Sequence, residues 1–250
     1  MKHSIYLLLL LIICSLSSYS QQIGRIETDR PDQTECPFIV KKGYFQGEFG
    51  FNRSISPTDI AYLLPTSLLK IGIHKNWELR YTTVLSAGTG ISPSFTTESF
   101  GFKVQLIESQ KSFLPKTALI VQYHWDNESR DESERNNLPH SIGETVFTFQ
   151  NNFSERFGIG YNVGLEYHSN GKVEGIYRFA PNMNIGKRGY AYVEVFGRFP
   201  KSIDTEFWGD FGLAYYISDD VKIDFSAGKS LQNNSDWYSA LGCSFRLKIW

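Results

Sequence analysis

The residues that come nearest to a catalytic arrangement lie in the stretch Glu166-Tyr167-His168-Ser169-Asn170-Gly171. A histidine that activates a serine nucleophile must lie within hydrogen-bond reach of it. In an extended strand, residues two apart share a face, whereas neighbours such as His168 and Ser169 point to opposite faces. Position 167 holds a tyrosine, which is a poor general base at neutral pH. Asn-Gly favours a tight hairpin turn, so we interpret the stretch as a turn and keep a lipid hydrolase as the alternative.

Other chemistry-bearing residues give weaker patterns. The histidines do not show the spacing of a metal site: they are His3, His74, His124, His140 and His168. The acidic run 126–134 could bind cations but is typical of a solvated loop. Cys36 precedes the first expected strand and Cys243 lies on the apolar face of the last, so we interpret both as isolated thiols rather than a disulfide. We therefore predict a non-enzyme with no catalytic residues, no metal and no cofactor.

Residues 1–20 have the organisation of a cleaved signal peptide. A short basic start at Lys2 and His3 precedes the apolar run 5–13 and the small, polar residues 15–20. The run is too short to span a bilayer as a helix, and no later stretch approaches about 18 apolar residues. A lipoprotein is the alternative, with Cys14 as the lipidated residue, although Ile13 before it is larger than such sites normally have. We expect export by a Gram-negative bacterium.

Stretches of alternating apolar and polar residues recur through the rest of the chain, which predicts half-buried strands. The clearest is 157–167, and the full set is 43–52, 69–73, 77–83, 100–106, 117–125, 147–150, 157–167, 177–179, 193–199, 207–217, 221–225 and 241–249. Short breaks at 74–76, 152–156 and 218–220 alternate with expected longer loops at 54–64, 86–97 and 127–139. An even strand number with alternately short and long connections is typical of a bacterial outer-membrane barrel.

Composition agrees with that interpretation. Aromatic residues make up 15% of the chain, with 14 Tyr, 19 Phe and 21 Gly, and barrels use aromatic residues in girdles at both membrane interfaces. The formal net charge of -1 gives no basis for binding nucleic acid. A soluble sandwich explains each strand singly, but the aromatic outward rows favour lipid. We predict an all-β, antiparallel, up-and-down transmembrane barrel of about twelve strands over residues 43–250, with outer-membrane lipids and the barrel-assembly machinery as partners.

Charged residues on the polar faces of these strands would line the lumen. The lumen candidates are Glu48, Lys70, Glu78, Arg80, Lys103, Glu166, Arg178, Glu194, Arg198 and Asp210. The preceding residues, 21–42, cannot form a strand with an apolar face, because Asp29, Arg30, Asp32 and Glu35 lie close to prolines. We expect these residues to be a periplasmic segment that folds into the barrel and pairs with the lumen charges, as a plug. A flexible periplasmic leader is the alternative.

Three stretches carry a family resemblance: IETDRPDQTE at 26–35, GYFQGEFGF at 43–51 and LLKIGIHKNWELR at 68–80. They resemble the family described as "putative MetA-pathway of phenol degradation", whose members are often labelled outer-membrane transporters. The resemblance implies a barrel that passes small solutes, aromatic or hydrophobic ones among them, and it supplies no catalytic or binding residues. A passive channel is therefore one expectation. A non-conducting barrel with a structural, adhesive or lipid-hydrolase role is the other, and the solute is not identified.

Overall fold

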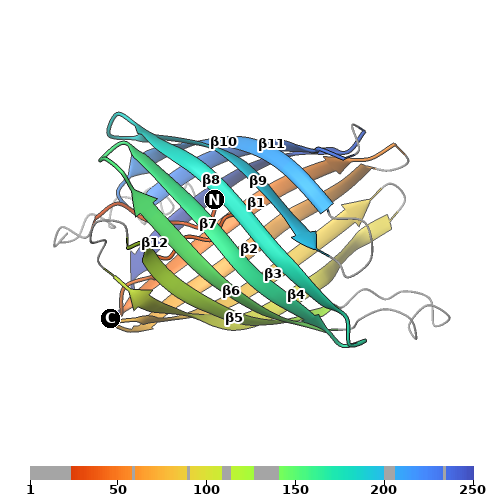
Figure 1. The fold of residues 1–250 in the computed structure, drawn as a ribbon, viewed down its shortest axis with the longest axis horizontal. Coiled ribbons are helices and arrows are strands. Elements are labelled where there is room, and N and C mark those ends of the chain that lie inside the picture. Colours follow the sequence, from red (N-terminus) through yellow and green to blue (C-terminus); the bar gives the residue numbers. More distant parts are fainter. Residues whose placement is uncertain are drawn as a thin grey trace, which may run out of the picture.

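Twelve strands close into one antiparallel barrel in the computed structural model (Figure 1). The structure describes residues 24–57, 60–88, 91–108, 114–126, 141–199, 206–232 and 235–250; the predicted signal peptide lies outside them. The strands are β1 Tyr44–Ile55, β2 Ile60–His74, β3 Trp77–Gly88, β4 Ile91–Ile107, β5 Lys116–Asp126, β6 Ser141–Asn152, β7 Phe157–His168, β8 Val173–Ile185, β9 Gly189–Phe199, β10 Glu206–Ser218, β11 Val221–Ser230 and β12 Trp237–Lys248.

Each strand pairs with the next one in the sequence, and β12 closes the ring by pairing with β1 from Tyr44↔Lys248 to Ile55↔Trp237. Closure leaves no unpaired sheet edge. The predicted barrel and its twelve strands are confirmed. Among the described residues there is no helix with the length and apolarity to cross a bilayer.

The two ends of the barrel differ in their connections. The C-terminal end, where β12 finishes near Trp250, has the short turns 75–76, 153–156, 186–188 and 219–220 and the longer connection 108–115. The opposite end, called the loop end below, has the connections 56–59, 89–90, 127–140, 169–172, 200–205 and 231–236, of which 127–140 is the longest. The expected loops 54–64 and 86–97 are wrong, because β1 to β4 continue through most of both stretches. Serine and threonine there pair in the ladder without the apolar contrast that marks a strand in a sequence.

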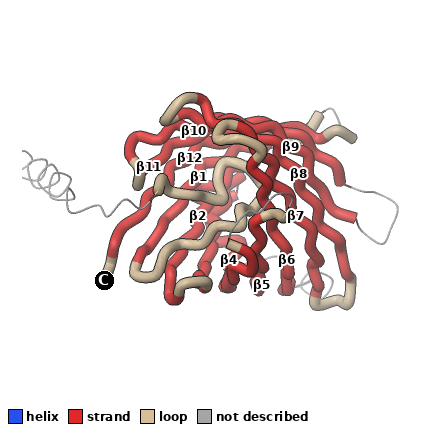
Figure 2. Tube along the Cα trace, turned by 60° about the vertical axis from the view of Figure 1, so that its left-hand side comes forward, coloured by secondary structure: helices blue, strands red, loops and turns tan. Residues whose placement is uncertain are grey.

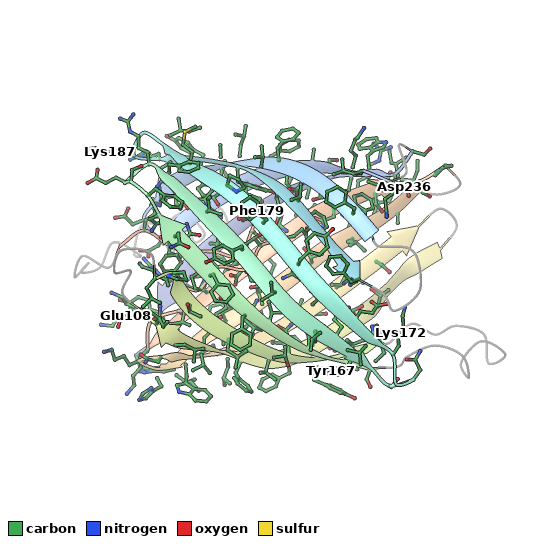
Figure 3. The ribbon with its side chains drawn as sticks, in the orientation of Figure 1. Glu108, Tyr167, Lys172, Phe179, Lys187 and Asp236 are labelled. Carbon is green, nitrogen blue, oxygen red and sulfur yellow. The ribbon has the colours of Figure 1, made fainter. Side chains whose placement is uncertain are left out.

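Side chains alternate along the strands between a mainly apolar outside and a mainly polar inside. On β10, Phe211, Leu213 and Tyr215 are 48%, 52% and 49% exposed, whereas the intervening Ala214 and Tyr216 are buried. Phe179 on β8 points away from the wall in the same manner (Figure 3). Buried lysines, arginines and carboxylates fill the inside of the described barrel. This inside-out distribution is the reverse of a soluble sandwich and matches a wall that faces lipid.

The described residues before β1, 24–42, lie inside the barrel and are called the N-terminal segment below (Figure 2). Ile26 and Val40, at its two ends, are 0% and 4% exposed. The backbone N–H of Ile26 donates to the carbonyl of Asp219 in the β10–β11 turn, at 2.7 Å. The segment therefore starts at the C-terminal end of the barrel and returns to it where β1 begins.

Candidate functional site in the barrel lumen

The N-terminal segment crosses the full width of the lumen. The Thr34 hydroxyl donates to the carboxylate of Glu194 on β9. The next residue, Glu35, accepts hydrogen bonds of 2.8 and 2.9 Å from Arg80 on β3. In the closed ring β3 and β9 are separated by five strands on either side. Because consecutive residues reach opposite walls, the segment divides the lumen into two parts.

Asp29 is the ionic centre of this attachment. Its carboxylate accepts hydrogen bonds from Lys70 Nζ at 2.8 Å and Lys103 Nζ at 3.0 Å, with the Arg80 guanidinium 3.5 Å away. Burial alone would raise the pKa of Asp29, but the three cations hold it well below its ordinary value. The lysine side chains are at most 1% exposed. Buried charges of this kind are tolerated only when they are paired.

Glu48 and Asp224 hold the residues on either side of this centre. The Glu48 carboxylate accepts from the backbone N–H groups of Asp29 and Arg30, at 3.1 and 3.0 Å. The Arg30 guanidinium lies 3.1 Å from Asp224 on β11. A Cβ on the inward-facing Gly50 would lie 2.2 Å from that guanidinium. The absence of a side chain at this glycine therefore makes room for the segment.

Asp32 lies against tyrosines rather than cations. Tyr190 on β9 donates to its carboxylate at 3.3 Å, and Tyr192 donates to the carbonyl of Pro31 at 3.1 Å. Burial raises the pKa of Asp32 to about 7, with Asp210 adding to the shift and Lys222 opposing it. These tyrosines were not among the predicted contacts of the segment. Strand parity could have found them, because Val193 points outward and its neighbours must point inward.

The segment joins the wall where it leaves the lumen. The backbone N–H of Val40 donates to Glu78 on β3 at 2.7 Å, and Lys42 forms a parallel bridge with Gly72 on β2. A Cβ at Gly72 would lie 2.1 Å from the carbonyl oxygen of Lys41. Only a glycine permits this approach of two backbones. The exit of the segment is thus set by backbone contacts as well as by charge.

A cavity of about 340 Å³ lies on the loop-end side of the segment. Its wall holds three arginines (Arg80, Arg178 and Arg198) and three glutamates (Glu35, Glu144 and Glu166). The Arg198 guanidinium donates to both oxygens of Glu166, at 2.9 and 3.1 Å. His124 lies 2.6 Å from Glu144 on the neighbouring strand. This wall is polar and balanced in charge, as suits the passage or binding of a hydrated solute.

Glu166, His168 and Glu174 come together near the loop end of the β7–β8 hairpin, with one ligand atom from each within 4.8 Å of the others. Spacing along the chain did not predict this trio, because Glu174 faces Glu166 only through the strand register. The donors are of types that bind divalent cations, but Arg198 and Lys172 already pair with the two carboxylates. Residues 169–172 form the predicted turn, with Gly171 at φ 81°.

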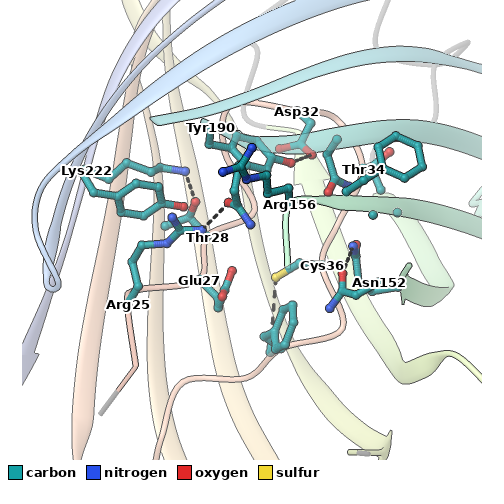
Figure 4. Close-up of a pocket in the computed structure, with 18 of the residues that line it drawn as sticks. Arg25, Glu27, Thr28, Asp32, Thr34, Cys36, Asn152, Arg156, Tyr190 and Lys222 are labelled. Atoms are coloured by element: carbon teal, nitrogen blue, oxygen red, sulfur yellow. Dashed lines mark hydrogen bonds between the residues drawn. The ribbon is translucent and has the colours of Figure 1, made fainter. Parts of the chain in front are cut away.

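Two further cavities lie on the C-terminal side of the segment. One of about 170 Å³ is bounded by segment residues and by Tyr190 and Lys222 (Figure 4). The Arg25 guanidinium stacks over the ring of Tyr216 at 3.8 Å, and Lys222 donates to Thr28 and to the carbonyl of Arg30. The other, of about 630 Å³, opens at the barrel mouth. Cys36 and Cys243 are both free thiols.

The ten lumen candidates all lie on the inward faces of their strands. Six contact the N-terminal segment through their side chains: Glu48, Lys70, Glu78, Arg80, Lys103 and Glu194. Asp210 accepts hydrogen bonds from Tyr192 and Tyr238. Glu166, Arg178 and Arg198 line the loop-end cavity. The four segment candidates, Asp29, Arg30, Asp32 and Glu35, each contact a side chain of the wall.

Comparison with known families agrees with this architecture. Residues 28–247 match the family described as "Putative MetA-pathway of phenol degradation". The chain belongs to this family. The match begins inside the N-terminal segment and ends in β12, so it covers most of the segment and nearly all of the barrel. A search of curated protein sequences found no match to this chain.

Solved structures share the fold of this family member at low sequence identity. The COG4313 outer membrane channel from Pseudomonas putida F1 aligns with a TM-score of 0.57 at 8% identity, over 88% of this chain and 100% of that one. The NanC porin aligns with a TM-score of 0.59 at 8% identity, over 80% and 100%. The KdgM porin, solved in complex with disordered oligogalacturonate, aligns with a TM-score of 0.53 at 7% identity, over 79% and 98%. At this identity the likeness is one of fold.

Proposed function

We propose that this protein is a passive outer-membrane channel for small solutes, with a lumen narrowed by the N-terminal segment. The observation that carries the proposal is the division of a polar, charge-lined lumen into cavities on either side of one segment. The apolar outer face supports a location in lipid. The shared fold with channels and porins supports passage of solutes, and the signal peptide expected at residues 1–20 supports export.

Aromatic side chains on the inner wall support aromatic molecules among the solutes. Phe196 and Trp208 face each other across β9 and β10, with ring centroids 6.4 Å apart. Tyr238 lies 6.0 Å from Trp208 on the other side. This row lies beside Arg178, which pairs in register with Phe196. A flat apolar ring can stack on such a row while polar substituents meet the arginine.

Conductance in planar bilayers tests the proposal. The mature chain and a variant lacking residues 21–40 are refolded, and the heat-modifiable migration of a closed barrel verifies the fold of each. We expect steady single-channel currents that increase on deletion, because the segment crosses the lumen. A matched control, Lys187→Gln, changes an exposed turn at the C-terminal end and should leave the current unchanged. If the mature chain and the deletion variant both fold into barrels but carry no current, the channel is refuted and the non-conducting alternative is favoured.

A further inference from the structure

The mouth at the C-terminal end of the barrel carries an excess of positive charge. The cavity that opens there is lined by six cationic side chains and two carboxylates, which leaves four positive charges in excess. The cations are Arg25, Lys41, Lys42, Lys75, Lys116 and Arg246, and the carboxylates are Glu27 and Glu108. The loop-end cavity has three arginines and three glutamates, so its formal charges balance. Of these two cavities, the one at the C-terminal mouth therefore carries the excess of positive charge.

Most of these cations are not neutralised by a close partner. Arg246 pairs with Asp220 at 2.6 Å, and Lys75 lies 3.9 Å from Glu108 with both side chains well exposed. The other four, Arg25, Lys41, Lys42 and Lys116, have no carboxylate within 4 Å among the described residues. Arg25 and Lys116 instead lie over aromatic rings, which fixes their positions at the rim. Their charge therefore remains directed at the solution in the mouth.

The physical effect of such a mouth follows from electrostatics in a confined cavity. Low-dielectric walls focus the field, and potentials of several kT are common in clefts lined by one sign of charge. The local concentration of anions rises and that of cations falls. Cavities lined by Arg and Lys act this way in anion-selective pores. The effect weakens with salt, because the Debye length shortens from about 10 Å at 0.1 M to about 3 Å at 1 M.

We propose that this channel is selective for anions, and that its solutes are small organic anions such as carboxylates, with Lys41, Lys42 and Lys116 at the C-terminal mouth determining the preference. The inference rests on the channel function proposed above and adds the charge class of the solute. The aromatic row near Arg178 fits the same class, since an aromatic carboxylate presents a flat ring and a negative group together.

Reversal potentials measured across a KCl gradient test the proposal. With the dilute side near 0.1 M, we expect an anion-to-cation permeability ratio of roughly five to ten, as a mouth potential of about one kT would give. Benzoate and benzylammonium, which match in size and differ in charge, replace chloride and potassium in a second measurement. Benzoate should be the more permeant. The ratio should fall toward one at about 1 M salt.

Two charge-reversal variants make the assignment specific. Lys41→Glu/Lys42→Glu reverses two charges that line the cavity and should bring the ratio to one or below. Lys187→Glu/Arg188→Glu makes the same change in net charge in the β8–β9 turn at the same end, outside the lining residues, and should leave the ratio nearly unchanged. Equal effects of both pairs would overturn the assignment to this cavity. Steady conductance with a ratio of one or below in the native chain would overturn anion selectivity alone, and absence of all conductance would overturn the channel and this inference together.

Discussion

Removal of the Asp29 carboxylate should release the N-terminal segment from the lumen. Asp29→Asn leaves Lys70 and Lys103 buried without the anion they share, although Glu48 remains 2.5 Å from Lys70 and Glu35 3.7 Å from Lys103. Loss of one partner of a buried ion pair costs about 3–5 kcal/mol, and the remaining carboxylates favour the lower value. About 3 kcal/mol raises the population of the released segment on the order of a hundredfold, at about 1.4 kcal/mol per factor of ten.

Cys36 reports this release. Cys36 is half-buried in the segment, and burial raises the pKa of its thiol, which slows reaction because the thiolate is the reactive form. With Cys243 replaced by serine, maleimide labelling of the folded mature chain follows exposure of residue 36 alone. We expect Asp29→Asn to accelerate labelling at least tenfold, a smaller factor than the population change because the docked thiol is partly exposed.

Asp220→Asn is the matched control for this experiment. It removes a carboxylate from an ion pair with Arg246 of similar length, 2.6 Å, but its side chain is 55% exposed. Exposed pairs contribute only about 0–1 kcal/mol, so labelling should change less than about fivefold. An unchanged labelling rate in Asp29→Asn, with the barrel folded, would refute the reasoning that this carboxylate holds the segment in the lumen.

Three further predictions concern Gly72, Asp32 and the outward-facing Val193. Gly72→Ala places a Cβ 2.1 Å from the carbonyl oxygen of Lys41. Since overpacking costs about 1–3 kcal/mol, this substitution should speed the labelling of Cys36 roughly fivefold, and an unchanged rate would contradict the tight backbone approach. The pKa of Asp32 is about 7 in the docked segment and 3.8 ordinarily, so docking is strongest below pH 3.8 and weakens as the pH rises through about 7. Channel current should therefore grow between about pH 5 and about pH 7.5, and less so in Asp32→Asn. A pH-independent current in the native chain would contradict this role of Asp32. Val193 is 57% exposed on the outside of β9, so Val193→Lys should cost about 2–4 kcal/mol in unfolding from lipid vesicles, whereas a change within about 0.5 kcal/mol would show that this face does not meet the membrane.

The barrel was predictable from the sequence because apolar and polar residues alternate along most of its strands. Alternation in stretches such as 157–167 identifies a strand and also says which residues face the lumen, so Glu166 and Glu194 could be placed inward from parity alone. The prediction failed where the contrast between apolar and polar residues is lost. Within 54–64 and 86–97, apolar and polar residues do not alternate clearly, and the strand pairing there comes from neighbouring strands rather than from the pattern itself.

The contacts of the N-terminal segment were not predictable in the same way. The clustering of acidic residues and prolines indicates a segment that is not a strand, and the inner charges indicate possible partners. Nothing in the sequence, however, states that Asp29 meets Lys70 and Lys103, because those residues lie on different strands and the segment has no periodicity. The pairing of Glu174 with Glu166 also depends on hairpin register. Sequence patterns give the face of a residue, whereas the partners across a lumen require the closed ring.

The position of the segment constrains the order of assembly. The ring closes at the β1–β12 seam, which pairs Tyr44 with Lys248, almost the whole mature chain apart. Arg30 binds Asp224 on β11 and lies within reach of a Cβ at Gly242 on β12, so its docking site does not exist until the last two strands arrive. Docking is therefore among the final steps of biogenesis. Until the seam forms, Asp29 and its neighbours have only the residues of the early strands, among them Glu48, Lys70 and Arg80, to hold them. A barrel stalled before closure would leave the segment open to proteases.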